Sequence, residues 1–462
     1  MHFVSSRGQA PALSFSDAML AGLASDGGLY LPETWPQVSP AEIAAYAGKP
    51  YAEVAFDIIR RFAGGDIADA DLADMIDAAY KGFRHPSVAP LVEIEPNHFV
   101  LELFHGPTLA FKDVAMQFLS RAMDHVLTAR DSRATIVGAT SGDTGSAAIE
   151  AFRGRDRLDI FILHPNGRTS EVQRRQMTTV LDANVHNIAI EGTFDDCQNI
   201  VKALFGNAPF REASRLSGVN SINWGRIVAQ IVYYFTAAVS LGAPQRKISF
   251  TVPTGNFGDI FAGYAAKRMG LPIDKLVIAT NANDILKRTL ATGRYEMQGV
   301  SPTISPSMDI QISSNFERLL FEATGRDGAA TARMMAGLKQ SGGFDLPAPA
   351  LAAIRAEFAA GTTDEAATAA TIADTYRNAG YLLDPHGAVG VAVAREHLGA
   401  TPMVSLATAH PAKFPAAVEA ATGVEPPLPV WLADLYGRAE RYDVLPADEG
   451  AVQTYIEART RA

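Results

Sequence analysis

Short apolar runs alternate with helical patterns over most of the chain. The runs are nearly continuous in apolar residues, as is typical of strands buried on both faces of a sheet. The predicted strands are Phe99–Leu103, Thr135–Ala139, Asp159–Leu163, Val185–Ile190, Ile248–Val252, Lys275–Thr280 and Met403–Ala407. The clearest helical patterns between them are Thr144–Phe152, Phe194–Phe205, Arg226–Ser240 and Phe257–Met269. This order predicts an α/β fold with largely parallel sheets.

Residues 1–95 have a different pattern, and we expect them to form a mostly helical N-terminal domain. Ser16 is placed to cap a short helix that carries Leu20 and Leu23. Leu29–Pro32 is expected to be a brief extended piece that ends at its proline. Further helical patterns lie at 40–47, 51–62 and 67–81.

Residues 96–462 are predicted to form two α/β lobes around a cleft. The predicted strands fall into one group before about residue 205 and another after about residue 245, which indicates the two lobes. Residues 343–379 are rich in alanine and helical in character, and 361–363 (Gly-Thr-Thr) is expected to be a loop within them.

Composition and charge narrow the class of protein. The chain has 462 residues, of which 48% are hydrophobic and 19% charged, so large cores are possible. The formal net charge is −10 without any cluster of Lys and Arg, so we expect no nucleic-acid partner. No apolar run approaches ~18–20 residues, and the N-terminus lacks a basic segment before an apolar core, so neither a membrane span nor a signal peptide is expected. The single cysteine, Cys197, excludes an internal disulfide framework and a cysteine zinc site, and is typical of the reducing cytoplasm.

Lys112 is the candidate for covalent chemistry. It follows the turn signal Gly106-Pro107 and the apolar residues 109–111, and an i, i+4 apolar stripe predicts a helix from Lys112 onward. The positive end of a helix and apolar surroundings both lower the pKa of a lysine, which makes its amine nucleophilic near neutral pH. A solvated surface lysine is the alternative, because most lysines are exposed.

Two glycine-rich segments, 138–148 and 253–260, each follow a predicted strand and precede a helix. Backbone N–H groups at a helix N-terminus bind anions, and glycine lets the backbone approach a ligand closely. The first segment lacks the Gly-Lys-Ser/Thr ending of a Walker loop, and a simple capped helix is its alternative. Two such cradles indicate either one ligand with two anionic groups or an anionic cofactor together with an anionic substrate.

Three further polar residues are candidates for ligand contacts. Thr408 ends a strand, where side chains face clefts in α/β folds, so its hydroxyl is placed to hydrogen-bond a ring nitrogen without protonating it. Lys413 is placed to reach an anionic substrate, or it is a surface charge. Arg226 lies at the start of an apolar helix. Its guanidinium either binds a carboxylate or phosphate of a ligand, or it forms a structural ion pair.

These segments together resemble the threonine synthases. Ser5–Gly8 and Gly22–Pro32 also resemble the N-terminal domain of that family, and the resemblance covers nearly the whole chain in the family order. It implies a fold-type II pyridoxal-phosphate enzyme, with 1–95 as the N-terminal domain and 96–462 as the catalytic region of two α/β lobes. The segments that carry the resemblance are Pro107–Asp113, Ser141–Gly145, Pro253–Asp259 and Thr408–Phe414.

The resemblance also implies roles for single residues. Lys112 would hold pyridoxal 5′-phosphate as a Schiff base, and Thr408 would face the pyridine nitrogen. Many fold-type II relatives have asparagine where this chain has Asp143 beside the ring hydroxyl, so an acid there needs a different protonation arrangement. The residues implied to bind the cofactor are Lys112, Asp143, Gly255, Asn256, Phe257, Gly258, Asp259 and Thr408, and those implied to bind substrate are Ser141, Thr144, Arg226 and Lys413.

The implied reaction is the last step of threonine biosynthesis, in which O-phospho-L-homoserine and water give L-threonine and phosphate. Lys112 would exchange its Schiff base with the substrate and carry protons at Cα and Cβ, so that phosphate leaves from Cγ and water adds at Cβ. We expect a cytoplasmic carbon–oxygen lyase without a metal, as a monomer or homodimer. Two other interpretations stay open: an elimination or dehydratase-type lyase with the same cofactor, and a non-catalytic phosphometabolite-binding protein.

Overall fold

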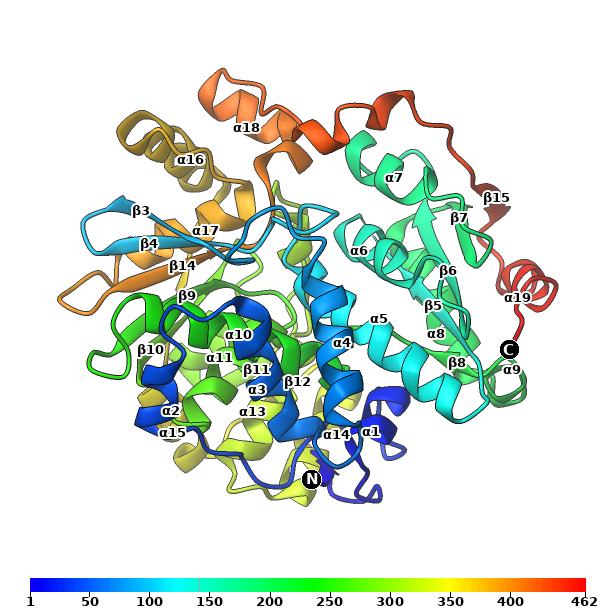
Figure 1. Ribbon diagram of the computed structural model, residues 1–462, viewed down its shortest axis with the longest axis horizontal. Coiled ribbons are helices and arrows are strands. Elements are labelled where there is room, and N and C mark those ends of the chain that lie inside the picture. The colour runs from blue at the N-terminus through cyan, green and yellow to red at the C-terminus, as the bar shows by residue number, and fades with distance from the viewer. Residues whose placement is uncertain (141) are drawn as a thin grey trace.

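The computed structural model describes residues 1–140 and 142–462, and its strands form two main sheets (Figure 1). The larger sheet has six strands in the order β13-β10-β9-β14-β4-β3, and all its neighbours are parallel except β3 and β4. Its strands are β3 (Leu91–Glu95), β4 (His98–Glu102), β9 (Ile248–Pro253), β10 (Ile273–Thr280), β13 (Phe358–Thr362) and β14 (Met403–Ala407).

The second sheet has five strands in the order β15-β7-β6-β5-β8, and every neighbouring pair in it is parallel. Every residue of β6, β9 and β14 is buried, which explains the continuous apolar runs in the sequence. The strands of this second sheet are β5 (Ala134–Ala139), β6 (Leu158–Pro165), β7 (Val185–Glu191), β8 (Leu216–Ser217) and β15 (Asp443–Pro446).

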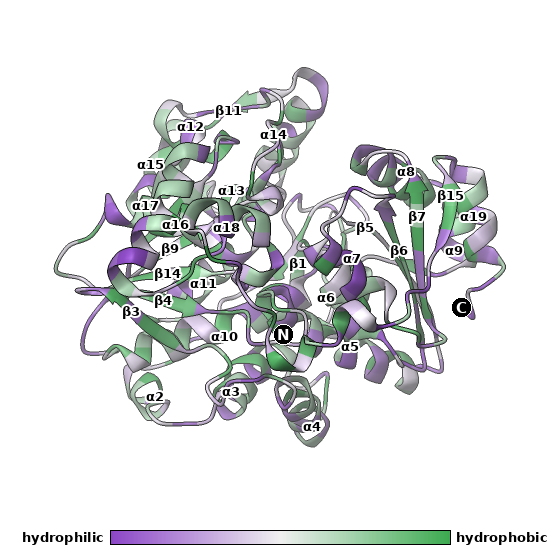
Figure 2. Ribbon diagram, turned by 90° about the horizontal axis from the view of Figure 1, so that it is seen from above, coloured by the Kyte–Doolittle hydropathy of each residue, from purple (hydrophilic) through white to green (hydrophobic). Residues whose placement is uncertain are grey.

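Helices connect the parallel strands and cover the sheets, because a parallel connection must cross from one end of the sheet to the other. The two sheets lie on opposite sides of α5 and α6 in both views (Figures 1 and 2). The helices after β4 are α5 (Lys112–Ala129), α6 (Asp143–Phe152), α7 (Glu171–Thr178), α8 (Phe194–Gly206), α9 (Ala208–Ala213), α10 (Trp224–Ser240), α11 (Gly258–Arg268), α12 (Ile285–Thr292), α13 (Phe316–Ala323), α14 (Gly328–Ser341), α15 (Ala348–Glu357), α16 (Glu365–Ala379), α17 (Pro385–Arg395), α18 (Pro415–Thr422) and α19 (Glu449–Glu457). Short 3-10 turns are η1 (Pro306–Met308), η2 (Pro411–Lys413), η3 (Val430–Leu432) and η4 (Leu435–Gly437), and a two-stranded sheet joins β11 (Arg294–Glu296) to β12 (Gly343–Asp345).

The N-terminal region packs against the central helices. Helix α10 contacts α3, α5 and α11, and Trp224 at its start touches the rings of Phe3, Trp35 and Phe62. Burial of such a large apolar side chain contributes on the order of 2–3 kcal/mol, so this aromatic cluster joins the N-terminal region to the rest of the core. The elements of this region are β1 (Phe3–Ser5), α1 (Phe15–Ala21), β2 (Tyr30–Pro32), α2 (Pro40–Ala45), α3 (Tyr51–Ala63) and α4 (Asp69–Tyr80).

The predicted α/β fold with largely parallel sheets is confirmed, whereas three local predictions are wrong. Ser14 rather than Ser16 caps α1, since the Ser14 side chain accepts from the Asp17 amide. The predicted loop at 361–363 mostly belongs to β13, which pairs with β10 at the edge of the larger sheet. β4 lies beside β14, so a strand from the first sequence group belongs to the larger sheet, together with the strands after residue 245. Among the described residues, no helix combines the length and apolarity needed to cross a membrane.

Candidate active site

A cavity of about 420 Å³ lies where several strands and helix N-termini meet. In α/β folds, ligands bind at the carboxyl ends of the strands. Here the starts of α5, α6, α10 and α11 and the residue after β14 all reach the same space. The predicted site residues that line it are Lys112, Thr144, Arg226, Gly255, Asn256, Phe257, Gly258, Asp259 and Thr408.

Lys112 is the first residue of α5, and its side chain is buried in this cavity. Its Nζ lies 3.9 Å from Oδ2 of Asp143 and 4.9 Å from the centre of the Phe111 ring. Burial lowers the pKa of Lys112 to about 8, and the positive charges of Arg226 and Lys413 act in the same direction against the attraction of Asp143. At a pKa of about 8, about one fifth of the amine is neutral, and nucleophilic, near physiological pH.

The turn before Lys112 is held rigidly. Asp113 accepts hydrogen bonds from the amide of Thr108 (2.8 Å) and from its hydroxyl (2.6 Å). A Cβ at Gly106 would lie 2.4 Å from Cβ of Asp113, so only glycine fits there. Leu109 is fully buried with φ of 64°, a conformation that costs a non-glycine residue about 1–2 kcal/mol. These restraints fix the direction in which α5 presents Lys112.

The amide of Phe111 donates to the carbonyl of Thr408 (2.8 Å), and Ala110 forms a β-bridge with Ala409. These bonds place the end of β14 directly beside Lys112, although the two segments lie far apart in the sequence. Thr408 is buried and lines the cavity.

Asp143 is the first residue of α6 and lies within a buried polar cluster behind Lys112. Its Oδ1 accepts from Nζ of Lys413 (2.9 Å) and from Nε2 of Gln173 (2.9 Å). Burial by itself raises the pKa of Asp143, but Lys413 and Lys112 outweigh it and hold that pKa well below its usual range. Asp143 is therefore a carboxylate at neutral pH.

The segment between β9 and α11 is the second of the two predicted anion cradles. Among the described residues, no acceptor bonds to the backbone amides of residues 255–260. Phe257 adopts φ of 64° at the start of α11, and the carbonyl of Gly255 is held by the hydroxyl of Ser313 (2.6 Å). Unbonded amides at a helix N-terminus, where the helix dipole is positive, are suited to a phosphate group.

Arg226 and Asp259 also face this space, and both carry buried atoms without partners. Arg226 is 3% exposed; its Nη1 donates to the carbonyl of Val219 (3.2 Å), while Nε has no partner in the described part of the chain. Asp259 accepts from Tyr233 (2.5 Å) and Tyr234 (3.0 Å) through Oδ1, and Oδ2 has no partner within residues 1–140 and 142–462. Burial raises the pKa of Asp259 to about 6, against the effect of the two tyrosine hydroxyls. The unpaired guanidinium atom is available to an anionic ligand.

His386, in the first turn of α17, also lines the cavity, although its sequence pattern does not predict a site residue. The amide of Ser307 donates to its Nε2 (3.2 Å), so its Nδ1 carries the proton and donates to Oδ2 of Asp384 (2.7 Å). The Asp384-Pro385-His386 sequence, an N-cap followed by proline and histidine, is the only local signal for this residue.

The remaining predicted residues lie differently. Lys413 is fully buried behind Asp143 and is absent from the cavity lining. Ser141 lies outside the described residues. The roles assigned to all these residues from the sequence stay predictions.

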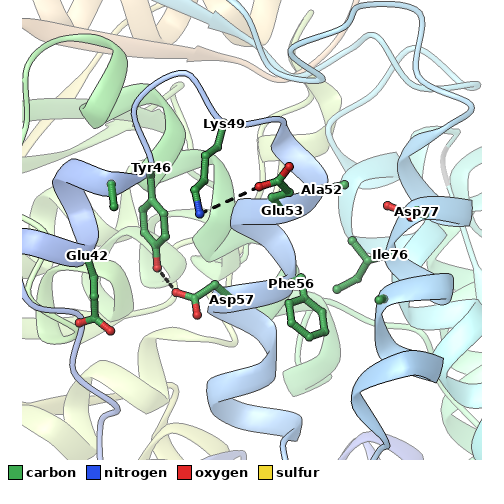
Figure 3. A pocket seen from close by; sticks show the side chains of 11 residues that line it. Glu42, Tyr46, Lys49, Ala52, Glu53, Phe56, Asp57, Ile76 and Asp77 are labelled. Atoms are coloured by element: carbon green, nitrogen blue, oxygen red, sulfur yellow. Dashed lines mark hydrogen bonds and ion pairs between the residues drawn. The ribbon is translucent and has the colours of Figure 1, made fainter.

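A second hollow of about 510 Å³ lies on the N-terminal helices α2, α3 and α4 (Figure 3). Tyr46 donates to Asp57 there, and Lys49 lies 4.0 Å from Glu53. None of the residues that line this hollow is a predicted site residue.

Comparison with known proteins gives the family. Residues 2–80 match the family model "Threonine synthase N terminus", residues 83–336 match "Pyridoxal-phosphate dependent enzyme", and residues 387–456 match "Threonine synthase, C-terminal". The threonine synthase of Pseudomonas aeruginosa is 56% identical over 459 residues, which cover 99% of this chain and 98% of that protein. The threonine synthase of Saccharomyces cerevisiae is 45% identical over 90% of this chain and 88% of its own.

A crystal structure of pyridoxal-phosphate-bound threonine synthase from Brucella melitensis superposes with a TM-score of 0.98 and 64% identity, covering 100% of both chains. The fold, the order of the matching segments and these identities agree. The chain is a pyridoxal-phosphate-dependent lyase and belongs to the threonine synthase family.

Proposed function

We propose that this enzyme converts O-phospho-L-homoserine and water to L-threonine and phosphate. The observation that carries the proposal is one cavity that joins three features: a buried lysine with a lowered pKa, a row of backbone amides, and a buried guanidinium. In the part of the chain that the structure describes, these amides have no acceptor and Nε of the guanidinium has no partner. The amine serves covalent and proton-transfer chemistry, and the other two groups each suit an anion.

The cavity fits pyridoxal phosphate. Lys112 would hold its aldehyde carbon, the amides of residues 255–258 would hold its phosphate, Thr408 would face its pyridine nitrogen, and Asp143 would lie toward its ring hydroxyl. The amides without acceptors and the buried amine support this assignment. When bound, the cofactor supplies an electron sink for charge that develops at the substrate carbons.

The side chains of the chain supply the other requirements of the reaction. Once its amine is released, Lys112 moves protons at Cα and Cβ of the substrate, and a pKa of about 8 suits an amine that must both accept and donate them. Arg226 and Thr144, which both line the cavity, bind the substrate, and the family resemblance implies the same role for Ser141.

The reaction is tested by incubating the purified holoenzyme with O-phospho-L-homoserine and measuring phosphate, threonine and 2-oxobutanoate. We expect phosphate and threonine to appear in equal amounts. If 2-oxobutanoate dominates, the enzyme is an elimination lyase with the same cofactor. If the purified protein binds the substrate without releasing phosphate, it is a binding protein.

The pKa of Lys112 predicts how cofactor loading depends on pH. Only the neutral amine reacts with an aldehyde, and the pKa is lowered from 10.5 to about 8. The rate at which the apoenzyme takes up pyridoxal phosphate should therefore rise about tenfold per pH unit below the pKa and level off above it. Stopped-flow absorbance between pH 6 and 10 measures this rate, with a blocked lysine peptide as the reference. A rate that still rises steeply between pH 9 and 10 would contradict the lowered pKa.

We also propose that the enzyme acts in the cytoplasm as a monomer or homodimer without a nucleic-acid partner. The net charge of −10 supports the absence of a nucleic-acid partner, and the single cysteine, which is buried, supports the cytoplasm.

A further inference from the structure

Lys413 is a lysine whose surroundings do not suit direct contact with substrate. Its side chain is fully buried on η2, just after β14. Nζ contacts three oxygens: Oδ1 of Asp143 at 2.9 Å, the carbonyl of Thr108 at 2.8 Å and Oγ of Ser146 at 3.5 Å. An ammonium group has three donors, so these contacts use all of them.

The contacts of Lys413 determine how Asp143 is presented. Oδ1 of Asp143 is occupied by Lys413 and by Gln173, whereas Oδ2 is the oxygen that lies 3.9 Å from Nζ of Lys112. Asp143 therefore forms a bridge between two lysines, one buried behind it and one in the cavity. Without Lys413, a single buried carboxylate would act on Lys112 with its full charge.

We propose that Lys413 is a positioning residue, which holds Asp143 as a carboxylate with Oδ2 toward Lys112 and offsets its charge so that Lys112 releases its proton readily. The proposal rests on the proposed role of Lys112 as the cofactor-binding lysine. It differs from the predicted role of Lys413 as a substrate ligand, because Lys413 acts through Asp143.

The charges around the pair agree with this assignment. Lys112 faces Asp143 and Asp113, which favour its protonated form, and Arg226 and Lys413, which oppose it. Asp143 faces Lys413, Lys112 and His386. Burial and these cations leave the pKa of Lys112 lowered although a carboxylate lies beside it. A neutral unit of Lys413 and Asp143 thus leaves Lys112 in a site of nearly balanced charge.

The hydrogen bonds of Lys413 also reach the turn that carries Lys112. The carbonyl of Thr108 accepts from Lys413 and from Nε2 of Gln176 (3.1 Å), while the amide and hydroxyl of Thr108 donate to Asp113. One cation therefore joins the end of β14, the start of α6 and the turn before α5. This arrangement is what a positioning residue requires.

The test is a double-mutant cycle on Lys413 and Asp143. Its readout is the pH midpoint of the visible absorbance of the holoenzyme, which reports the protonation of the Lys112 nitrogen that is bonded to the cofactor. Lys413→Met removes the offsetting cation, so the midpoint should rise by about one pH unit. Asp143→Asn leaves Lys413 without its counter-ion, and the midpoint should fall by a similar amount. The double variant Lys413→Met/Asp143→Asn removes both charges and should return the midpoint to within about 0.3 unit of the wild type.

The outcomes separate the possible roles. If Lys413 only supports the fold, Lys413→Met should lower the thermal stability, and the double variant should not return the pH midpoint to the wild-type value. If Lys413 binds substrate, Lys413→Met should raise KM and leave the pH midpoint of the substrate-free holoenzyme unchanged. Either result overturns the proposal. If Lys413→Met does not fold, the double variant and Asp143→Asn still provide two midpoints to compare with the wild type. Loss of the visible band in Lys112→Ala tests the cofactor role separately, so failure of one assignment is distinguishable from failure of the other.

Discussion

Replacing Lys112 with alanine is expected to lower kcat for threonine formation by about 10³–10⁴-fold, because the variant lacks the group that moves protons at the substrate. It should also abolish the visible absorbance of the protein-bound cofactor, since no amine remains in the cavity to bond with it. Lys112→Arg keeps the positive charge but not a nucleophilic amine, and it should be as inactive as alanine. The measurements are steady-state kinetics and an absorbance spectrum of the dialysed protein.

The matched control for this variant is Lys49→Ala. Lys49 is an exposed lysine in the loop between α2 and α3, 4.0 Å from Glu53 (Figure 3), and its loss should leave both kcat and the spectrum unchanged. Retention of the visible band in Lys112→Ala would show that another amine holds the cofactor. The proposed site would then be wrong.

Arg226→Leu is expected to raise KM for O-phospho-L-homoserine about 100-fold, which corresponds to about 2.7 kcal/mol of lost binding. The physical reason is the buried guanidinium, whose Nε has no partner among the described residues and whose pKa burial lowers to about 10. Such a group is costly in the free enzyme and favourable only when an anion arrives. We therefore expect the apoenzyme of Arg226→Leu to be as stable as the wild type, or more stable.

The contrasting variant is Arg174→Leu. Arg174 makes two contacts with Glu440, at 2.9 and 3.0 Å, so its loss should lower the unfolding temperature and leave KM unchanged. If Arg226→Leu instead behaves like Arg174→Leu, Arg226 has a structural role and not a binding one. Thermal unfolding of the apoenzymes and substrate titrations of the holoenzymes give the two readings that decide between them.

Much of the secondary structure was predictable because its signals are local. Seven of the eleven strands of the two sheets were recognisable from apolar runs, since buried parallel strands need apolar residues on both faces, whereas β3, β8, β13 and β15 were not predicted. The start of α5 at Lys112 followed from the turn signal and the apolar stripe. The capping prediction at Ser16 failed by two residues because several residues in that segment are able to cap, and only the backbone shows that the Ser14 side chain accepts from the Asp17 amide.

The partly missed elements are those whose stability comes from distant partners. β13 has an alanine and glycine-rich sequence that favours neither helix nor strand strongly, and its pairing with β10 makes it a strand. His386 was missed for the same reason. A histidine after a capping residue and proline carries no local sign of a cavity, and Ser307 and Asp384 orient it only after the fold brings them together.

The sequence by itself determined that this protein has an α/β core, a lysine at a helix start, and two glycine-rich segments that each follow a strand and precede a helix. These features are encoded by residue types at short spacing, where hydrogen-bonding capacity and periodicity act locally. Only the tertiary structure decided which of these groups share a cavity and which charged groups lie near each of them. Oδ1 of Asp143 lies 2.9 Å from Nζ of Lys413 only because α6 and the segment after β14 pack together. The pKa of Lys112 is low because that packing removes water from around its amine. Burial and electrostatic coupling depend on distance in space, and the order of residues along the chain does not contain that distance.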